Sequence, residues 1–253
     1  MFKPIKALGQ NFLMDRQVGW DMVDALGVAG GDEIIEIGSG HGVVTEALAD
    51  KVRNTSCVLY TIEIDERFIQ KLVNKFSRDK NIKVVQGNIL DFLPNFEPKR
   101  EFKIIGSLPY YITSPIIHAV IEMQKFPQTC VFLIQKEVAE KISLKSPDSS
   151  YLSVYIQTFF DVEYLFKVAR TEFKPEPKVD GGVIKLTKKD INFDSEFKKR
   201  YRGFLHKGFG SPRKMLNKRF SKEELEKGGI NPKIRSQNLS SDEWLKFYKV
   251  SQS

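Results

Sequence analysis

Glycine occupies every second position of a short motif near the N-terminus, Gly38-Ser39-Gly40-His41-Gly42. The apolar pair Ile34-Ile35 precedes it, and a stretch with helical character, residues 43–49, follows. A strand, a glycine turn and a helix in this order let the backbone approach a ligand, because a Cβ at the glycines would collide with it. The spacing GxGxG favours a smaller cofactor than the dinucleotides that GxGxxG binds. Taken alone, the motif is equally typical of a purely structural turn.

Polar side chains follow two further strand-like segments. Glu63 and Asp65 come at the end of residues 57–62, about 20 residues beyond the glycine turn. An acid in this place can accept hydrogen bonds from two ribose hydroxyls, although Asp65 is also placed to cap the next helix. Asn88 follows the segment 82–86, where a polar side chain could bind the edge of the cofactor's base.

A fourth strand-like segment, residues 102–105, leads into Gly106-Ser107-Leu108-Pro109-Tyr110-Tyr111. The carboxyl ends of parallel strands meet at one edge of an open sheet, and ligands bind at that edge. Four successive strand ends with polar or aromatic residues therefore indicate a single site.

The elements that would position this site alternate between strand and helix. Helical periodicity marks residues 15–26, 66–76 and 114–123. Later strand-like segments are a fifth, central strand at 129–134 and two last strands at 162–168 and 182–186. The segment 152–159 fits either a helix or a strand. This alternation predicts an α/β fold with a doubly wound, Rossmann-like parallel sheet.

The C-terminal part of the chain is basic and helical in character. Between residues 191 and 220, Asp194 and Glu196 oppose nine basic residues: Lys198, Lys199, Arg200, Arg202, Lys207, Arg213, Lys214, Lys218 and Arg219. Three helix starts are expected, at Ser211-Pro212, at a capping box of Ser221 with Glu224, and at another of Ser240 with Glu243. We expect residues 1–188 to form the main domain and 189–253 a small helical domain.

Composition limits the possible functions. The chain has 253 residues, 41% of them hydrophobic, and a formal net charge of +8, which favours a polyanionic partner. No apolar run approaches the roughly 18 residues of a membrane helix, so we expect a cytoplasmic monomer. The two cysteines and three histidines lack metal-ligand spacing, and no metal is expected.

In this order the motifs resemble the small-subunit ribosomal RNA adenine N6,N6-dimethyltransferases (KsgA-like), which use S-adenosylmethionine. The resemblance covers residues 8–13, 36–42, 62–65, 107–110, 135–139, 173–180 and 213–216. It implies a class I methyltransferase sheet, a small C-terminal helical domain, and methylation of a small-subunit rRNA loop during ribosome biogenesis. The large-subunit rRNA adenine methyltransferases share the first half of the pattern, whereas residues 213–214 and 235–239 look more like the small-subunit group.

The resemblance also assigns roles to residues. The implied cofactor-binding residues are Asn11, Leu13, Gly38, Gly40, Glu63, Asn88 and Ser107. The target base would be held by Ser107, Leu108, Pro109 and Tyr110. RNA would be contacted by Phe173, as a second aromatic wall, and by Lys207, Arg213, Lys214, Lys218 and Arg219.

Two residues depart from the family pattern, Ser107 in place of asparagine and Asn88 in place of aspartate. The asparagine side chain and the next carbonyl accept hydrogen bonds from the target amine and favour its attack geometry. Losing one such preorganised contact costs on the order of 3 kcal/mol, which slows a reaction by roughly a hundredfold or more. For Asn88 we expect weaker cofactor binding. A catalytically weakened or inactive RNA-binding assembly factor is therefore the alternative function, and methylation of large-subunit rRNA is a third.

Overall fold

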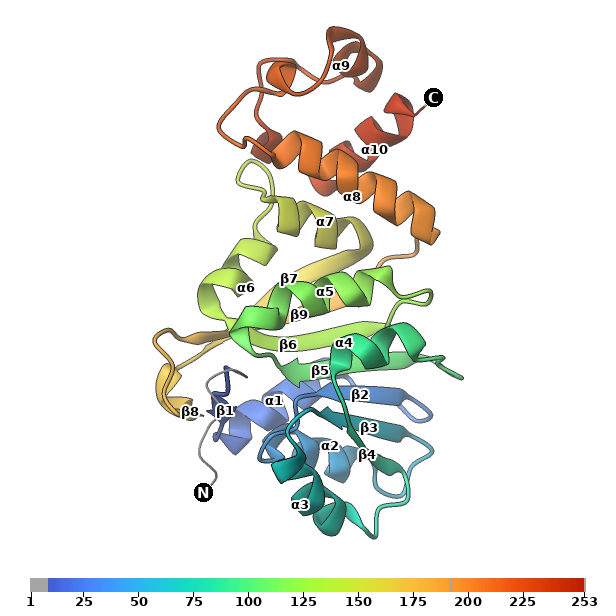
Figure 1. The fold of residues 1–253 in the computed structure, drawn as a ribbon, viewed down its shortest axis with the longest axis vertical. Helices are drawn as coiled ribbons and strands as arrows, with labels where there is room; N and C mark the ends of the chain where they lie inside the picture. Colours follow the sequence, from blue (N-terminus) through green and yellow to red (C-terminus); the bar gives the residue numbers. More distant parts are fainter. Residues whose placement is uncertain (1–8, 192, 253) are drawn as a thin grey trace. The chain divides into compact units, whose positions relative to one another are not determined.

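The computed structural model describes residues 9–191 and 193–252 (Figure 1). The chain forms two compact units. The first contains the described residues up to Ala139 together with Glu163–Lys188, and the second contains Glu140–Val162 and the chain from Lys189 onward. The expected main domain, residues 1–188, thus includes a segment, 140–162, that packs with the second unit. No described helix has both the length and the apolar character that crossing a membrane requires.

A seven-stranded sheet forms the centre of the first unit, with the order β4-β3-β2-β5-β6-β9-β7. Its strands are β2 (Glu33–Ile37), β3 (Val58–Glu63), β4 (Ile82–Gln86), β5 (Phe102–Ser107), β6 (Thr129–Gln135), β7 (Phe160–Val168) and β9 (Gly181–Lys188). Strands β4, β3, β2, β5 and β6 run parallel, and β9 pairs antiparallel with β6. The expected α/β sheet is confirmed. The expected strand at residues 129–134 is β6, which lies inside the sheet between β5 and β9. The middle strand of the seven is its neighbour β5.

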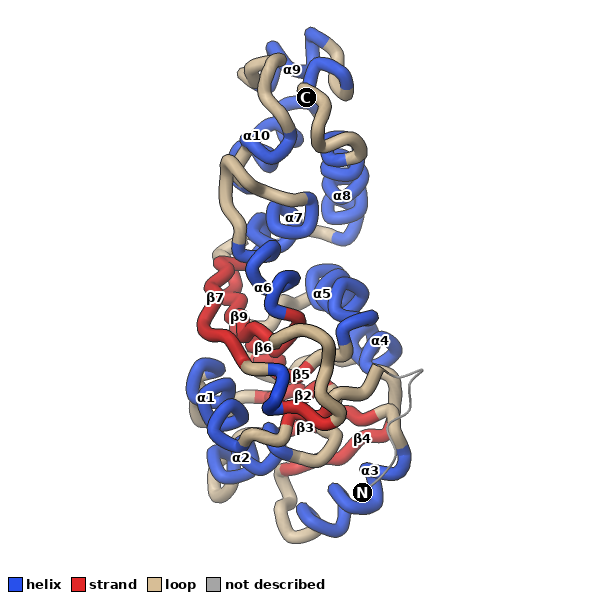
Figure 2. Tube along the Cα trace, turned by 90° about the vertical axis from the view of Figure 1, so that its left-hand side faces the viewer, coloured by secondary structure: helices blue, strands red, loops and turns tan. Residues whose placement is uncertain are grey.

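Helices cover both faces of this sheet. They are α1 (Arg16–Leu26), α2 (Val43–Val52), α3 (Glu66–Phe76), α4 (Ile89–Phe92) and α5 (Thr113–Glu122). Figure 2 shows α1 and α2 on one side of the sheet and α4 and α5 on the other. Asp15 and Asp65 begin α1 and α3, since their carboxylates accept hydrogen bonds from Val18 N and Arg67 N at 3.0 and 3.1 Å. The expected helices at 15–26, 66–76 and 114–123 are confirmed to within a residue.

A second, two-stranded sheet was not expected from the sequence. Strand β1 (Phe12–Leu13) pairs antiparallel with β8 (Phe173–Lys174), so that Leu13 lies opposite Phe173. Met14 N also donates to Glu172 O at 2.8 Å. Two-residue strands carry no periodic pattern, and their pairing joins segments far apart in the chain.

The second unit is helical. It contains α7 (Tyr151–Phe159), α8 (Ser195–Phe209), α9 (Lys222–Gly228) and α10 (Ser241–Ser251), while α6 (Lys136–Ser143) spans the boundary between the units. The ambiguous segment 152–159 is a helix that packs against α8 and α10. The aromatic side chains Tyr201, Trp244 and Phe247 are fully buried in its core.

Two of the three expected helix starts in this unit are confirmed. Ser221 with Glu224 and Ser240 with Glu243 form the capping boxes of α9 and α10. The third is wrong, because no α-helix begins at Ser211-Pro212 and only a short 3-10 turn, Leu216–Lys218, follows. At Leu216 the backbone pairs with a distant segment instead of continuing an α-helix, since Leu216 N donates to Ile234 O at 2.8 Å.

Candidate active site

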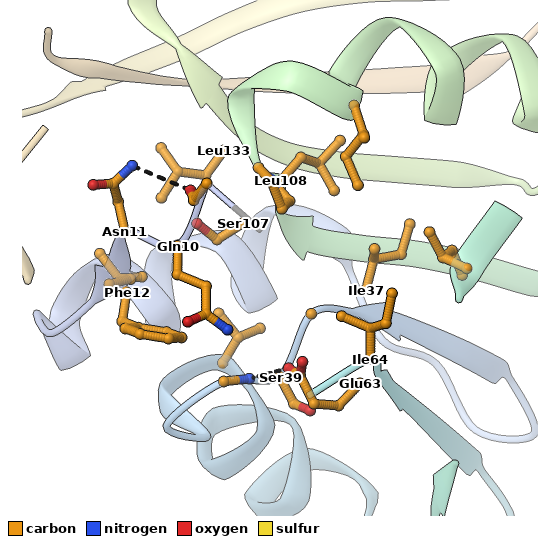
Figure 3. Close-up of a pocket in the computed structure, with 18 of the residues that line it drawn as sticks. Gln10, Asn11, Phe12, Ile37, Ser39, Glu63, Ile64, Ser107, Leu108 and Leu133 are labelled. Carbon is orange, nitrogen blue, oxygen red and sulfur yellow. Dashed lines mark hydrogen bonds between the residues drawn. The ribbon is translucent and has the colours of Figure 1, made fainter. Parts of the chain in front are cut away.

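One pocket lies at the carboxyl ends of β2, β3, β4 and β5, and Figure 3 shows its lining. All of the expected cofactor-binding and base-holding residues line it: Asn11, Leu13, Gly38, Gly40, Glu63, Asn88, Ser107, Leu108, Pro109 and Tyr110. Phe173 lines it as well, from β8. Parallel strands end at one edge of the sheet, which is why residues far apart in the chain meet here. Every lining residue belongs to the first unit.

The glycine turn forms one wall of the pocket. Gly38, Gly40 and Gly42 have φ angles of +72°, +49° and +84°, in the region where a Cβ causes strain. A Cβ on Gly38 would have only Ser107 O near it, at 3.7 Å, whereas one on Gly40 would come within 2.9 Å of the Phe12 ring. Gly38 therefore leaves space for a ligand, and Gly40 leaves space for Phe12.

Two backbone N–H groups hold the Glu63 carboxylate in place at the end of β3. Gly40 N donates to its Oε2 at 2.8 Å and Asp65 N donates to its Oε1 at 2.9 Å. Burial raises the pKa of this carboxyl above its ordinary value. Each oxygen accepts one of these bonds and keeps a lone pair, so the carboxylate can accept from a pair of ligand hydroxyls.

Two buried polar groups lie beside the glycine turn that the sequence did not single out. The Ser39 hydroxyl lines the pocket and has no hydrogen-bond partner in the described part of the chain. Glu36, at the pocket floor in β2, accepts from Thr45 Oγ1 at 2.8 Å, and burial raises the pKa of Glu36 to about 7. An acid within the apolar run of residues 34–37 is the signal that could have identified Glu36. An unpartnered buried hydroxyl indicates that a ligand completes this part of the pocket.

The segment before α1 covers the glycine turn. Phe12 packs against His41 and Phe68, with ring centroids 4.8 and 5.1 Å apart. Gln10 Nε2 donates to Asp65 Oδ2 at 2.7 Å. Hydrogen bonds from the Arg67 side chain are the main reason that the pKa of Asp65 is about 2. The segment from residue 9 onward is therefore held by aromatic contacts and by a charged network. The sequence also predicts an N-terminal arm, residues 1–11, that becomes ordered only over cofactor or RNA, and residues 1–8 of this arm lie outside the described part of the chain.

Asn88 has a local structural role. Its Oδ1 accepts from Leu90 N at 3.0 Å and so caps α4. The amide nitrogen remains to donate to a ligand, and the carboxamide oxygen keeps one lone pair beside the helix cap. Ile64 lies next to Glu63 with 50% of its surface exposed, and it lines the pocket too. An apolar side chain beside hydrogen-bonding groups is typical of a site for a flat base.

The segment at the end of β5 contributes two hydrogen-bond acceptors and a tyrosine to the pocket. Leu108 N donates to Leu133 O at 2.9 Å and fixes the turn after β5. Neither the Ser107 hydroxyl nor the Leu108 carbonyl is bonded to another described group. Tyr110 is half-buried, and its enclosed hydroxyl has no partner in the described part of the chain. Burial raises the pKa of Tyr110, so its hydroxyl stays protonated. Two acceptors beside an aromatic ring suit a planar ligand that bears an amino group.

The expected RNA-binding residues other than Phe173 belong to the second unit. Arg213, Lys214 and Lys218 are exposed and form no ion pair with the described residues. Lys207 pairs with Glu224 at 2.7 Å, and Arg219 contacts Ser211. Lys198 from the same basic run is 1% exposed and so belongs to the core of the unit. The basic surface is therefore smaller than the sequence indicates.

Together, the parallel sheet, the glycine turn, the acid after β3 and the acceptors after β5 define a class I methyltransferase. The family model "Ribosomal RNA adenine dimethylase" matches residues 1–253. The chain belongs to this family and is an rRNA adenine dimethyltransferase, as the resemblance of its motifs indicated.

Known proteins agree with this assignment. The chain is 37% identical to a ribosomal RNA small subunit methyltransferase A of Sulfurihydrogenibium sp. (strain YO3AOP1), over 98% of this chain and 96% of that protein. It is 33% identical to the protein of that name from Persephonella marina, over 98% and 93%. Among solved structures, it is similar to the 23S rRNA methyltransferase ErmE, at 26% identity, with a TM-score of 0.75 over 96% of this chain and 100% of that one. A dimethyladenosine transferase from Plasmodium falciparum, at 24% identity, shares the fold with a TM-score of 0.78 over 93% and 95%.

Proposed function

We propose that this enzyme methylates N6 of adenines in a loop of small-subunit rRNA, with S-adenosylmethionine as its cofactor. The observation that carries the proposal is the lining of one pocket, which is shared by Glu63 from the end of β3 and by Ser107, Leu108 and Tyr110 from the end of β5. The small subunit is favoured because the curated relatives cited above are named for it.

The residues of the pocket fit S-adenosylmethionine. Glu63 would accept from the ribose hydroxyls, Asn88 would donate to a ring nitrogen of the adenine, and Gly38 would lie against the methionine part. Two observations support this fit: the Ser39 hydroxyl has no partner among the described residues, and the glycine turn has positive φ angles that let the backbone approach a ligand. The bound cofactor supplies the methyl group as a sulfonium.

Ser107, Leu108 and Tyr110 would prepare the target amine. The Ser107 hydroxyl and the Leu108 carbonyl can each accept one N6 hydrogen, which directs the nitrogen lone pair toward the cofactor side of the pocket. Tyr110 would stack on a base that has left its helix or loop. No base on the protein is required, because an N6 proton becomes acidic on methylation and can leave to water. RNA phosphates would be bound by Arg213, Lys214 and Lys218.

The test is to incubate the protein and labelled S-adenosylmethionine with small subunits that lack the modification. Mass spectrometry of the rRNA nucleosides then reports the position and number of methyl groups. We expect labelled dimethyladenosine in small-subunit rRNA. An absence of label in adenine, with protein that binds the cofactor, would contradict the proposal.

The similarity to ErmE makes large-subunit rRNA a second candidate substrate. Large subunits incubated in parallel distinguish the two, because the label then appears in 23S-type rRNA. The weakened-enzyme alternative is tested with Ser107→Asn, for which the serine-to-amide change predicts a faster reaction by up to roughly a hundredfold. Equal rates for the two proteins would show that the serine is as effective as the amide.

A further inference from the structure

Tyr111 is an exposed aromatic residue beside the pocket. The large hydrophobic side chains that are exposed in the described part of the chain include one aromatic residue, Tyr111, with 55% of its surface exposed. Tyr111 directly follows Tyr110 and lines the same pocket. Burying a ring of this size normally stabilises a fold. An exposed ring beside a site is instead typical of a surface that a ligand covers.

The backbone fixes where this ring points. Tyr110–Ile112 form a 3-10 turn in which Ile112 N donates to Pro109 O at 3.1 Å. Thr113 Oγ1 donates to the same carbonyl at 3.2 Å. Successive side chains on a 3-10 turn project about 120° apart, so the two tyrosine rings point in different directions. Tyr110 is half-buried with its hydroxyl enclosed, whereas Tyr111 lines the same pocket with 55% of its surface exposed and so lies at the outer rim.

Contacts with the N-terminal segment support the ring from one side. A Cβ on Gly9 would lie 2.8 Å from Tyr111 Cδ1 and 3.1 Å from Cε1, so the Gly9 backbone lies close against the ring. The Tyr111 hydroxyl makes no hydrogen bond with the described residues. The face of the Tyr111 ring is therefore the part that is available to a ligand. Because the Gly9 backbone already restricts this ring, it loses little conformational entropy on binding.

We propose that Tyr111 stacks on a nucleobase adjacent to the target adenine, at the outer rim of the pocket that receives the target itself. The inference rests on the proposed function, because only a nucleic acid presents a second base one nucleotide from the first. Stacking on an aromatic ring tolerates any base. Tyr111 is then a substrate-positioning residue that adds affinity for the RNA without reading its sequence.

The test compares Tyr111→Ala, Tyr111→Leu and Tyr111→Phe with the natural protein on undermethylated small subunits. Tyr111→Ala and Tyr111→Leu remove the aromatic face, and we expect KM for the subunits to rise roughly five- to hundredfold. Tyr111→Phe keeps the face and is expected to retain most of the affinity. Val73→Ala is the matched control, because Val73 is an exposed apolar residue of α3 and does not line the pocket.

Two further measurements make the result specific. Calorimetry with S-adenosylmethionine is expected to give the same cofactor affinity for all variants, which separates stacking from damage through Gly9. An RNA loop with 2-aminopurine next to the mapped adenine is expected to lose fluorescence on binding the natural protein and Tyr111→Phe, but not Tyr111→Leu.

The possible outcomes separate the inference from the function on which it rests. An unchanged KM for Tyr111→Leu would overturn it, as would a loss in Tyr111→Phe equal to that in Tyr111→Leu, which would point to the hydroxyl. Both results require natural protein that methylates adenine. If the natural protein methylates neither subunit, the proposed function fails first and the inference fails with it.

Discussion

Replacing Glu36 with glutamine is expected to remove a pH dependence from the stability of the fold. Glu36 is 1% exposed in β2, and its carboxylate accepts from Thr45 Oγ1 at 2.8 and 2.9 Å. The pKa of this group is raised from 4.5 to about 7, chiefly by burial and also by the nearby Glu63, against the hydrogen bonds that lower it. The folded protein therefore binds the Glu36 proton more tightly than the unfolded chain does.

The direction of the effect follows from that difference. The stabilisation is fully present below pH 4.5, where both states are protonated, and it is lost as the pH rises through about 7. At higher pH the folded protein must hold a buried negative charge, which water solvates in the unfolded chain. The interval between the two pKa values corresponds to roughly 3 kcal/mol of unfolding free energy.

Chemical denaturation of the natural protein and Glu36→Gln between about pH 5 and pH 8 measures this contribution. The difference in unfolding free energy should move by roughly 2 to 3 kcal/mol in favour of Glu36→Gln toward the alkaline end. The pKa of Glu63 is also raised by burial, and Glu63 titrates in both proteins, so the comparison reports Glu36 together with its electrostatic interaction with Glu63. Glu97→Gln, at an exposed position, is the control. Parallel pH profiles for the natural protein and Glu36→Gln would refute the reasoning.

Three other changes have expected outcomes. Gly40→Ala places a Cβ 2.9 Å from the Phe12 ring at a φ of +49°. The left-handed backbone adds a strain of about 1–2 kcal/mol to this clash, so calorimetry should show at least tenfold weaker binding of S-adenosylmethionine. Joint replacement of Arg213, Lys214 and Lys218 by glutamine should lower the slope of log affinity against log salt by roughly 2 to 3 in RNA titrations; an unchanged slope would exclude phosphate contacts by these residues. Ser240→Ala removes the cap of α10 and should cost about 1 kcal/mol, measured as a lower melting temperature with cofactor affinity unchanged.

Elements defined by local signals could be predicted from the sequence. Strand β4 (Ile82–Gln86) and helix α3 (Glu66–Phe76) have the bounds that their patterns indicate. Asp65 marks the start of α3 because its side chain can accept from the first turn. The grouping of the site residues in one pocket was equally accessible, since the carboxyl ends of parallel strands must meet.

Elements that depend on distant partners could not be predicted in this way. Residues 211–216 have a serine-proline start but no helix, because Leu216 pairs with Ile234. The basic run likewise gave no indication that Lys198 is buried or that Lys207 pairs with Glu224. Burial and ion pairing depend on which side chains the fold brings together, and a one-dimensional pattern does not contain that information.

The glycine motif combines two physical requirements that its spacing cannot separate. The space beside Gly38 is open toward the pocket, with Ser107 O at 3.7 Å from an added Cβ. The space beside Gly40 is filled by Phe12, which the pairing of β1 with β8 holds in place. A side chain at Gly38 would thus extend into the space of the pocket, whereas one at Gly40 would meet the segment that covers the turn. Because β8 contributes Phe173 to the same pocket, the shape of the pocket depends on a strand pair that joins segments far apart in the chain.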